Sequence, residues 1–173
     1  IGRTWTCGTF QLDFVLPQRL GAFYIDEKGE RKNPVMLHRA VLGSLERFTG
    51  MIIENYAGQF PFWLAPVQVI LIGVSNKFDK EVLEFASELK TAFKEKNHKD
   101  LRLEVDIKNE RISYKIRHYT EQKIPHIITI GEKEIQNKIF TIRKLSGEVI
   151  EMNTEDYLNL ISLESTKKQS EVI

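Results

Sequence analysis

Hydrophobic residues in the second part of the chain follow two patterns in turn, one typical of strands and one typical of helices. Residues 67–72 form a near-continuous apolar run, as in a central strand that is buried on both faces. Apolar residues then recur at helical spacing between Val82 and Phe93. The remaining predicted elements are strands at 101–107, 126–130 and 139–142 and helices at 112–119 and 157–161. This order predicts a mixed βαβαβ-type sheet covered by helices.

The first part of the chain contains an alternation of apolar and polar residues that predicts a strand with two unlike faces. The apolar positions are Phe10, Leu12, Phe14 and Leu16, and the polar positions between them are Thr9, Gln11 and Asp13. A polar strand face meets solvent or lines a site for a small polar substrate. The residues alone leave both interpretations open.

The segment 38–47 places a histidine, a glycine and an arginine within ten residues, after a second strand predicted around 35–37. Gly43 has no Cβ and suits a sharp turn or a close ligand, and Ser44 is a favoured N-cap for a helix that is predicted to end near Tyr56. The first N–H groups of a helix attract anions, and the guanidinium of Arg47 suits phosphate. The segment is therefore either a nucleotide site or an ordinary strand-turn-helix corner.

Composition and charge narrow the functional classes. The 173 residues are 42% apolar, which is enough for a buried core, and one cysteine cannot form an internal disulfide, as in proteins of a reducing compartment. No apolar run approaches the length of a membrane span, so no membrane partner is expected. The net charge of +1 argues against indiscriminate polyanion binding. Any contact with RNA would depend on where single residues are placed.

Three blocks of sequence resemble threonyl-tRNA synthetases, and they stand in the same order. The blocks are Gly2–Phe14, His38–Arg47 and Glu54–Gly58 leading to Trp63–Val69. The resemblance covers nearly the whole chain. It implies that residues 1–62 are the C-terminal end of a class II catalytic domain with its third signature motif, and that residues 63–173 are an anticodon-binding domain. The implied fold class is α/β: the end of an antiparallel-sheet catalytic domain, followed by a domain with a mixed, mainly parallel central sheet.

The function implied by the resemblance is that of a threonine–tRNA ligase, which activates threonine with ATP and Mg²⁺ and transfers it to threonine tRNA. By similarity, Thr9, Ser44 and Arg47 bind ATP, with Arg47 as the catalytic residue, and Cys7, Gln11 and His38 border threonine. This implies that Thr9, Gln11, Ser44 and Arg47 face one cavity. A cytoplasmic location and a homodimer of the full-length protein are further expectations, and an organellar form stays open.

A zinc ion is implied in the full-length enzyme, and His38 stands where the family places one ligand. The other ligands, a cysteine and a second histidine, lie upstream of Ile1 in the family. Zinc in proteins takes three or four protein ligands. We therefore expect this chain by itself to hold no cofactor tightly and to catalyse no aminoacylation.

The resemblance also implies contacts with the anticodon, whose unstacked bases expose their edges to side chains. The implied residues are Asn109, Lys123, Glu134 and Arg143. Without the resemblance, these residues would equally fit a solvated surface. An alternative function is a non-catalytic RNA-binding module or accessory subunit derived from a class II synthetase. Synthetases for proline, glycine or histidine are a third possibility, but the block from Trp5 to Asp13 and His38 favour threonine.

Overall fold

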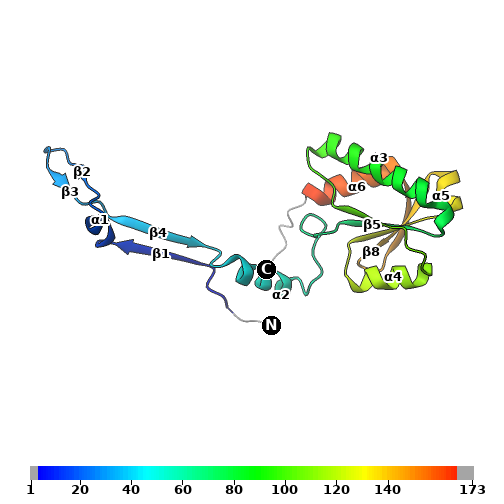
Figure 1. Cartoon of the computed structure of the whole chain (residues 1–173), viewed down its shortest axis with the longest axis horizontal. Helices are drawn as coiled ribbons and strands as arrows, with labels where there is room; N and C mark the ends of the chain where they lie inside the picture. Colours follow the sequence, from blue (N-terminus) through cyan, green and yellow to red (C-terminus); the bar gives the residue numbers. More distant parts are fainter. Residues whose placement is uncertain (1–3, 167–173) are drawn as a thin grey trace. The chain divides into compact units, whose positions relative to one another are not determined.

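The computed structural model describes residues 4–166, which form two compact units, one ending at Asn55 and the other beginning at Tyr56 (Figure 1). Each unit is described by itself. The domain boundary expected between residues 62 and 63 lies within the second unit, and it stays a prediction for the whole protein. Within the described residues, no helix is both long and apolar enough to cross a membrane.

The first unit is built on an antiparallel ribbon of β1 (Gly8–Asp13) and β4 (Met36–Val41). The prediction that the first strand continues to Leu16 is wrong. Oδ1 of Asp13 accepts hydrogen bonds from the backbone N–H groups of Val15 and Leu16, at 2.8 and 2.9 Å, and the short helix α1 (Leu16–Arg19) begins there. An aspartate that binds backbone groups in this way competes with the strand ladder.

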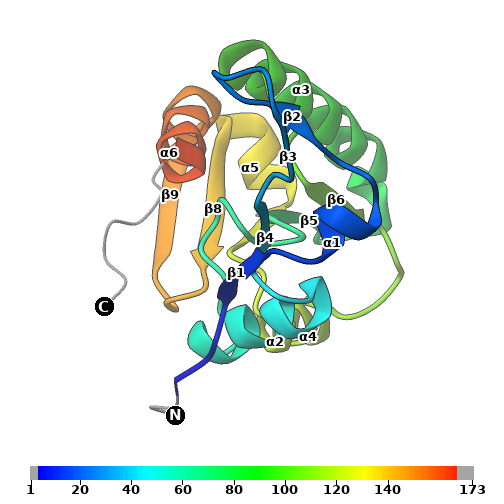
Figure 2. The ribbon, with the colours of Figure 1, turned by 90° about the vertical axis from the view of Figure 1, so that its left-hand side faces the viewer.

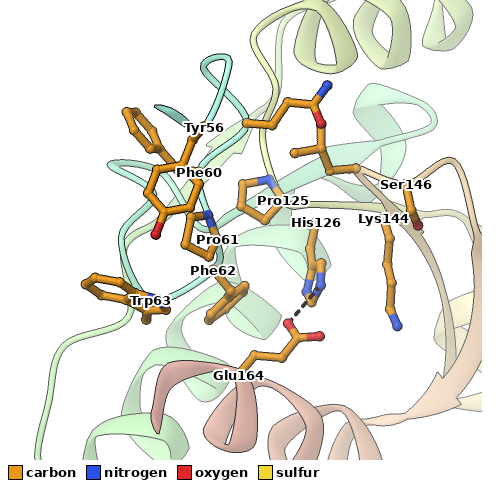
Figure 3. Close-up of a pocket in the computed structure, with 12 residues that line it drawn as sticks. Tyr56, Phe60, Pro61, Phe62, Trp63, Pro125, His126, Lys144, Ser146 and Glu164 are labelled. Carbon is orange, nitrogen blue, oxygen red and sulfur yellow. Dashed lines mark ion pairs between the residues drawn. The ribbon is translucent and has the colours of Figure 1, made fainter. Parts of the chain in front are cut away.

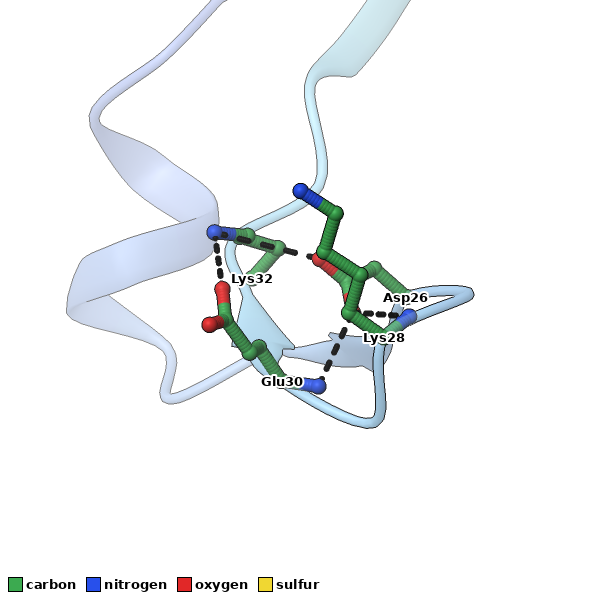
Figure 4. Close-up of polar contacts among 4 residues, drawn as sticks. All are labelled: Asp26, Lys28, Glu30 and Lys32. Carbon is green, nitrogen blue, oxygen red and sulfur yellow. Dashed lines mark hydrogen bonds and ion pairs between the residues drawn. The ribbon is translucent and has the colours of Figure 1, made fainter.

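A small hairpin lies between the two strands of the ribbon, and it consists of β2 (Tyr24–Ile25) and β3 (Arg31–Lys32). Oδ1 of Asp26 accepts hydrogen bonds from the backbone N–H groups of Lys28 and Glu30, both at 2.9 Å (Figure 4). Nζ of Lys32 lies 2.8 Å from Oε2 of Glu30 on the same turn. These contacts are a local, exposed set that shapes the turn, and they involve none of the predicted site residues.

The second unit contains a five-stranded sheet in the order β6-β5-β7-β8-β9. The strands are β5 (Val69–Gly73), β6 (Leu103–Asp106), β7 (His126–Ile130), β8 (Ile139–Lys144) and β9 (Val149–Asn153). β6, β5 and β7 run parallel, and β7, β8 and β9 pair antiparallel. The predicted mixed sheet is confirmed, with parallel pairing in half of the sheet.

Helices cover the two faces of this sheet unequally. The helices of the second unit are the 3-10 turn η1 (Asn76–Phe78), α3 (Asp79–Asn97), α4 (Ile112–Glu121), α5 (Glu132–Asn137) and α6 (Thr154–Thr166). α3 and α6 lie on one face, over the larger core, and α4 lies on the other (Figures 1 and 2). The smaller core beneath α4 joins Ile70 and Ile72 of β5 to Ile127 of β7.

The face that carries α4 is left open over the antiparallel half of the sheet. Strand registers place Ile127, Arg143 and Val149 in one row across β7, β8 and β9, and Thr129, Thr141 and Glu151 in the next. Since side chains alternate along a strand, both rows point away from the larger core, which takes Phe140 and Ile142 instead. We call the part formed by Thr129, Thr141, Arg143, Val149 and Glu151 the open face.

Candidate functional site

The polar face of the β1–β4 ribbon brings three of the candidate site residues together with Asp13. Gln11 lies directly opposite His38 in the antiparallel register, and Thr9 and Asp13 flank Gln11 at a spacing of two. They therefore share one face. Nε2 of His38 lies 3.1 Å from Oδ2 of Asp13. The sequence reasoning did not assign Asp13 to the site, although its place in the alternation indicated the shared face.

Backbone groups keep the carboxyl group of Asp13 ionised. The N–H groups of Leu16 and Val15, together with His38, hold the pKa of Asp13 below its ordinary value. A carboxylate beside an imidazole orients the ring and selects which nitrogen carries the proton. Asp13 is thus positioned to orient His38.

The turn at Gly43 and the helix that follows agree with the sequence prediction. Leu42 and Gly43 both have positive φ, 70° and 67°, and α2 (Leu45–Asn55) begins directly afterwards. Oγ of Ser44 accepts a hydrogen bond from the backbone N–H of Arg47 at 3.1 Å, which is the contact of an N-cap. The guanidinium of Arg47 lies 5.1 Å from the centre of the Trp5 ring. Arg47 is exposed.

Replacing Ser44 with alanine is expected to loosen the first turn of α2. The backbone N–H of Arg47 would lose its side-chain acceptor, and such a loss typically costs about 1 kcal/mol. Hydrogen exchange at this amide should therefore rise about fivefold. Ser44→Asp is the control, because aspartate retains a capping oxygen and should leave the exchange near the parent rate. Equal exchange in the alanine variant and the parent would contradict the capping role.

Two shallow hollows on the ribbon are each bordered by some of the residues that were expected to share one cavity. Cys7 and Thr9 border one shallow hollow on the ribbon, and Gln11 and His38 border another. Ser44 and Arg47 line neither of these two. A ribbon of two strands has no wall opposite its polar face, so it cannot enclose a small molecule by itself.

The chain does not form a zinc site with its described residues. Between residues 4 and 166, no group of three or more His, Cys, Asp or Glu side chains is close enough to hold a metal ion. Cys7 is exposed, and the His38 ring contacts the carboxylate of Asp13. One histidine and one carboxylate do not supply the three or four ligands of zinc. The described residues therefore support no chemical step that uses zinc.

In the second unit, Arg143 lies on the open face, and the side chain of Glu134 contacts its neighbour Thr141 there. Glu134 lies in α5, and its side chain accepts hydrogen bonds from the backbone N–H of Gly131 at 3.0 Å and from Oγ1 of Thr141 at 3.3 Å. Thr141 and Arg143 are neighbours on the same face of β8. The Arg143 side chain is half-buried and makes no hydrogen bond or ion pair with residues 4–166. Its guanidinium donors are therefore available to a ligand.

Asn109 and Lys123 stand at the two ends of α4, on the same face of the sheet. Asn109 is exposed in the connection between β6 and α4. Lys123 follows α4, has a positive φ of 58°, and donates a hydrogen bond from Nζ to the backbone O of Ala57. Asn109, Lys123 and Arg143 thus lie on the α4 side of the sheet. The side chain of Glu134 reaches Thr141 there, although α5 itself packs on the larger core through Ile135. The sequence alone does not indicate that these side chains reach the same face of the sheet.

A cavity of about 490 Å³ lies at another place in the second unit, beside the N-terminal end of β7 (Figure 3). His126 is buried there, with Nδ1 3.0 Å from the hydroxyl of Tyr157 and Nε2 3.2 Å from Oε2 of Glu164. Burial, assisted by the charge of Glu164, raises the pKa of Tyr157, which keeps its hydroxyl protonated. These contacts tie α6 to the sheet. None of the predicted site residues lines this cavity.

Comparison with known proteins identifies the class of this chain. Residues 68–163, more than half of the chain, match the family described as the anticodon binding domain. Residues 1–56 match the tRNA synthetase class II core domain (G, H, P, S and T). The chain therefore belongs to the family of anticodon-binding domains, which here follows a segment of class II core.

The most similar relatives include threonine–tRNA ligases, and the resemblance predicted from the sequence is confirmed. The threonine–tRNA ligase of Francisella tularensis subsp. novicida (strain U112) is 49% identical over 170 residues, which cover 98% of this chain and 26% of that protein. The crystal structure of the RNA binding domain of threonyl-tRNA synthetase from Cryptosporidium parvum Iowa II is 30% identical, with a TM-score of 0.72, over 94% of this chain and 40% of that one. The chain thus spans about a quarter of the length of the curated relatives that it matches.

Proposed function

We propose that the second unit reads the anticodon of threonine tRNA as part of a threonine–tRNA ligase. The observation that supports this proposal is that Asn109, Lys123 and Arg143 share the α4 side of the sheet, with the side chain of Glu134 bonded to Thr141 on the open face. A protein with nearly balanced charge gains little from bulk attraction to phosphate, so its selectivity has to come from contacts with base edges.

The spacing of these residues favours a ligand that is a single-stranded RNA segment with several unstacked bases, rather than one base. Asn109 follows β6, and Arg143 lies on β8, three strand positions away, which corresponds to about 14 Å across a sheet. Bases that leave their stack can each meet a different side chain over such a span. Arg143 can donate two parallel hydrogen bonds to a guanine, and Asn109 can both donate to and accept from a base edge.

We propose that the first unit contributes to the binding of threonine and ATP once the rest of a catalytic domain closes over its polar face. ATP with Mg²⁺ would meet Thr9, Ser44 and Arg47, the last as the cation that stabilises charge on the phosphates. Threonine would border Cys7, Gln11 and His38. His38 would be one of several zinc ligands, with Asp13 orienting its ring. Homodimerisation and a cytoplasmic location stay predictions.

The proposal is tested by the affinity of the 173-residue chain for threonine tRNA and for the same tRNA with each anticodon base replaced in turn. At one fixed salt concentration, we expect replacement of a base that is read to weaken binding about five- to 150-fold, the range for a good contact with a base edge. Replacements in the acceptor stem are the control and should leave the affinity unchanged. Equal affinity for all anticodon variants would overturn the assignment.

A further inference from the structure

A buried ion pair lies directly beside the connection that carries Asn109. Lys115 of α4 and Asp106 at the end of β6 are only 2% and 4% exposed. Nζ of Lys115 lies 3.3 Å from Oδ1 of Asp106 and donates a hydrogen bond to the backbone O of the same residue at 3.2 Å. The lysine therefore joins the helix to the last residue of the strand through both the side chain and the main chain of Asp106.

The same carboxylate binds two further donors. Oδ1 of Asp106 accepts a hydrogen bond from the backbone N–H of Lys108, and Oδ2 accepts one from the hydroxyl of Tyr119, both at 2.8 Å. Burial pushes the pKa of Asp106 upward, but these hydrogen bonds and the charge of Lys115 outweigh it, so the net pKa is lowered. Burial and the bond to Asp106 raise the pKa of Tyr119, which keeps it a donor. The carboxylate of Asp106 is thus ionised at neutral pH and is bonded through both of its oxygens.

Stability alone does not account for a buried pair of this kind. Removing two charges from water is costly, and apolar residues of similar volume are often equally good or better for stability. What the network does locally is to hold both ends of the strand-to-helix connection. Within that connection, the backbone N–H of Glu110 also donates to the backbone O of Lys108 at 2.9 Å. Asn109 is left exposed in the middle of the connection, and its side chain makes no hydrogen bond with residues 4–166.

We infer that Asp106, Lys115 and Tyr119 are positioning residues that hold Asn109 in the conformation in which it reads one anticodon base. The inference rests on the proposed function of the open face and of α4. A connection that is already ordered loses less conformational freedom when RNA binds, which increases affinity without any new contact. The three residues act through Asn109 and do not themselves touch the RNA.

The decisive variant is Tyr119→Phe, which removes one hydroxyl and retains the ring that packs in the smaller core. We expect the 173-residue chain to bind threonine tRNA about three- to tenfold more weakly, as for a lost hydrogen bond. For tRNA in which the base read by Asn109 has been replaced, Asn109→Ala should cause no loss of affinity. Tyr119→Phe should cause no loss with that same tRNA. In an Asn109→Ala background, Tyr119→Phe should cause no further loss. The matched control is Tyr114→Phe on the same helix, where the tyrosine is 55% exposed and should have no effect.

A second variant and a second measurement distinguish a loss of positioning from a folding defect. Lys115→Met combined with Asp106→Asn leaves no unpaired buried charge and should reproduce the effect of Tyr119→Phe. Hydrogen exchange at the Lys108 amide reports directly on the connection and should rise in both variants. An equal loss for every anticodon variant, or an undiminished loss in the Asn109→Ala background, would overturn the inference. If the parent chain binds all anticodon variants alike, the proposed function itself has failed.

Discussion

Arg143→Ala is expected to weaken the binding of threonine tRNA by about five- to 150-fold, which corresponds to the loss of one two-pronged contact with a base. Arg143 lies on the open face, and its guanidinium makes no hydrogen bond or ion pair with residues 4–166. Its removal should therefore leave the fold intact. Arg143→Lys should recover only part of the affinity, because an ammonium cannot form the same planar pair of bonds.

The measurement is a titration of the 173-residue chain with threonine tRNA at fixed salt, with unfolding followed in parallel. Lys90→Ala is the matched control, since it removes one positive charge from α3 on the opposite side of the sheet. In the whole ligase, we expect Arg143→Ala to leave adenylate formation nearly unchanged. A loss of affinity equal to that of Lys90→Ala, or an equal loss of adenylate formation and tRNA binding, would remove Arg143 from the set of anticodon readers.

Phe93→Ala is expected to lower the free energy of unfolding of the second unit by about 3–5 kcal/mol. Phe93 is 1% exposed and belongs to the larger core between α3, α6 and the sheet. Truncation of its ring removes apolar contacts and leaves a cavity in a closely packed interior. Such a loss is a large part of the stability of an ordinary domain.

Urea unfolding followed by tryptophan fluorescence measures this effect in a Trp5→Phe background. The chain has two tryptophans, so Trp63 then reports on the second unit alone. Leu83→Ala on the same helix is the control, because Leu83 is 49% exposed and its truncation should cost less than about 1 kcal/mol. An equal change in the free energy of unfolding for the two variants would contradict the role of Phe93 in the larger core.

The periodicity of apolar residues predicts the larger helices and strands but not the smaller ones. The strand at 126–130 and the helices around Val82–Phe93 and 157–161 follow long apolar repeats, and each is present. β9 and α5 were missed because a strand with an exposed face and a helix of six residues have too few apolar positions to form a repeat. Extension of the first strand to Leu16 failed for a different reason, namely the side-chain bonds of Asp13.

The candidate residues for RNA binding rest on family resemblance, whereas the contacts around them depend on tertiary structure. No spacing rule connects Asp106 with Lys115 and Tyr119, because the strand and the helix first meet when α4 packs on the sheet. In the same way, His38 and Asp13 become neighbours only through the register of β1 with β4. Sequence patterns can indicate which face a residue takes, but the partner across that face depends on register and packing.

The ribbon of the first unit has a practical consequence for work with this chain. Its second face presents apolar side chains to solvent, among them Phe10, Leu12, Leu37 and Val41, each 57–65% exposed. Apolar surfaces of this kind promote self-association at high concentration. Titrations with tRNA should therefore be run at low protein concentration, and light scattering should accompany them, so that clustering of the ribbon is not mistaken for recognition of RNA.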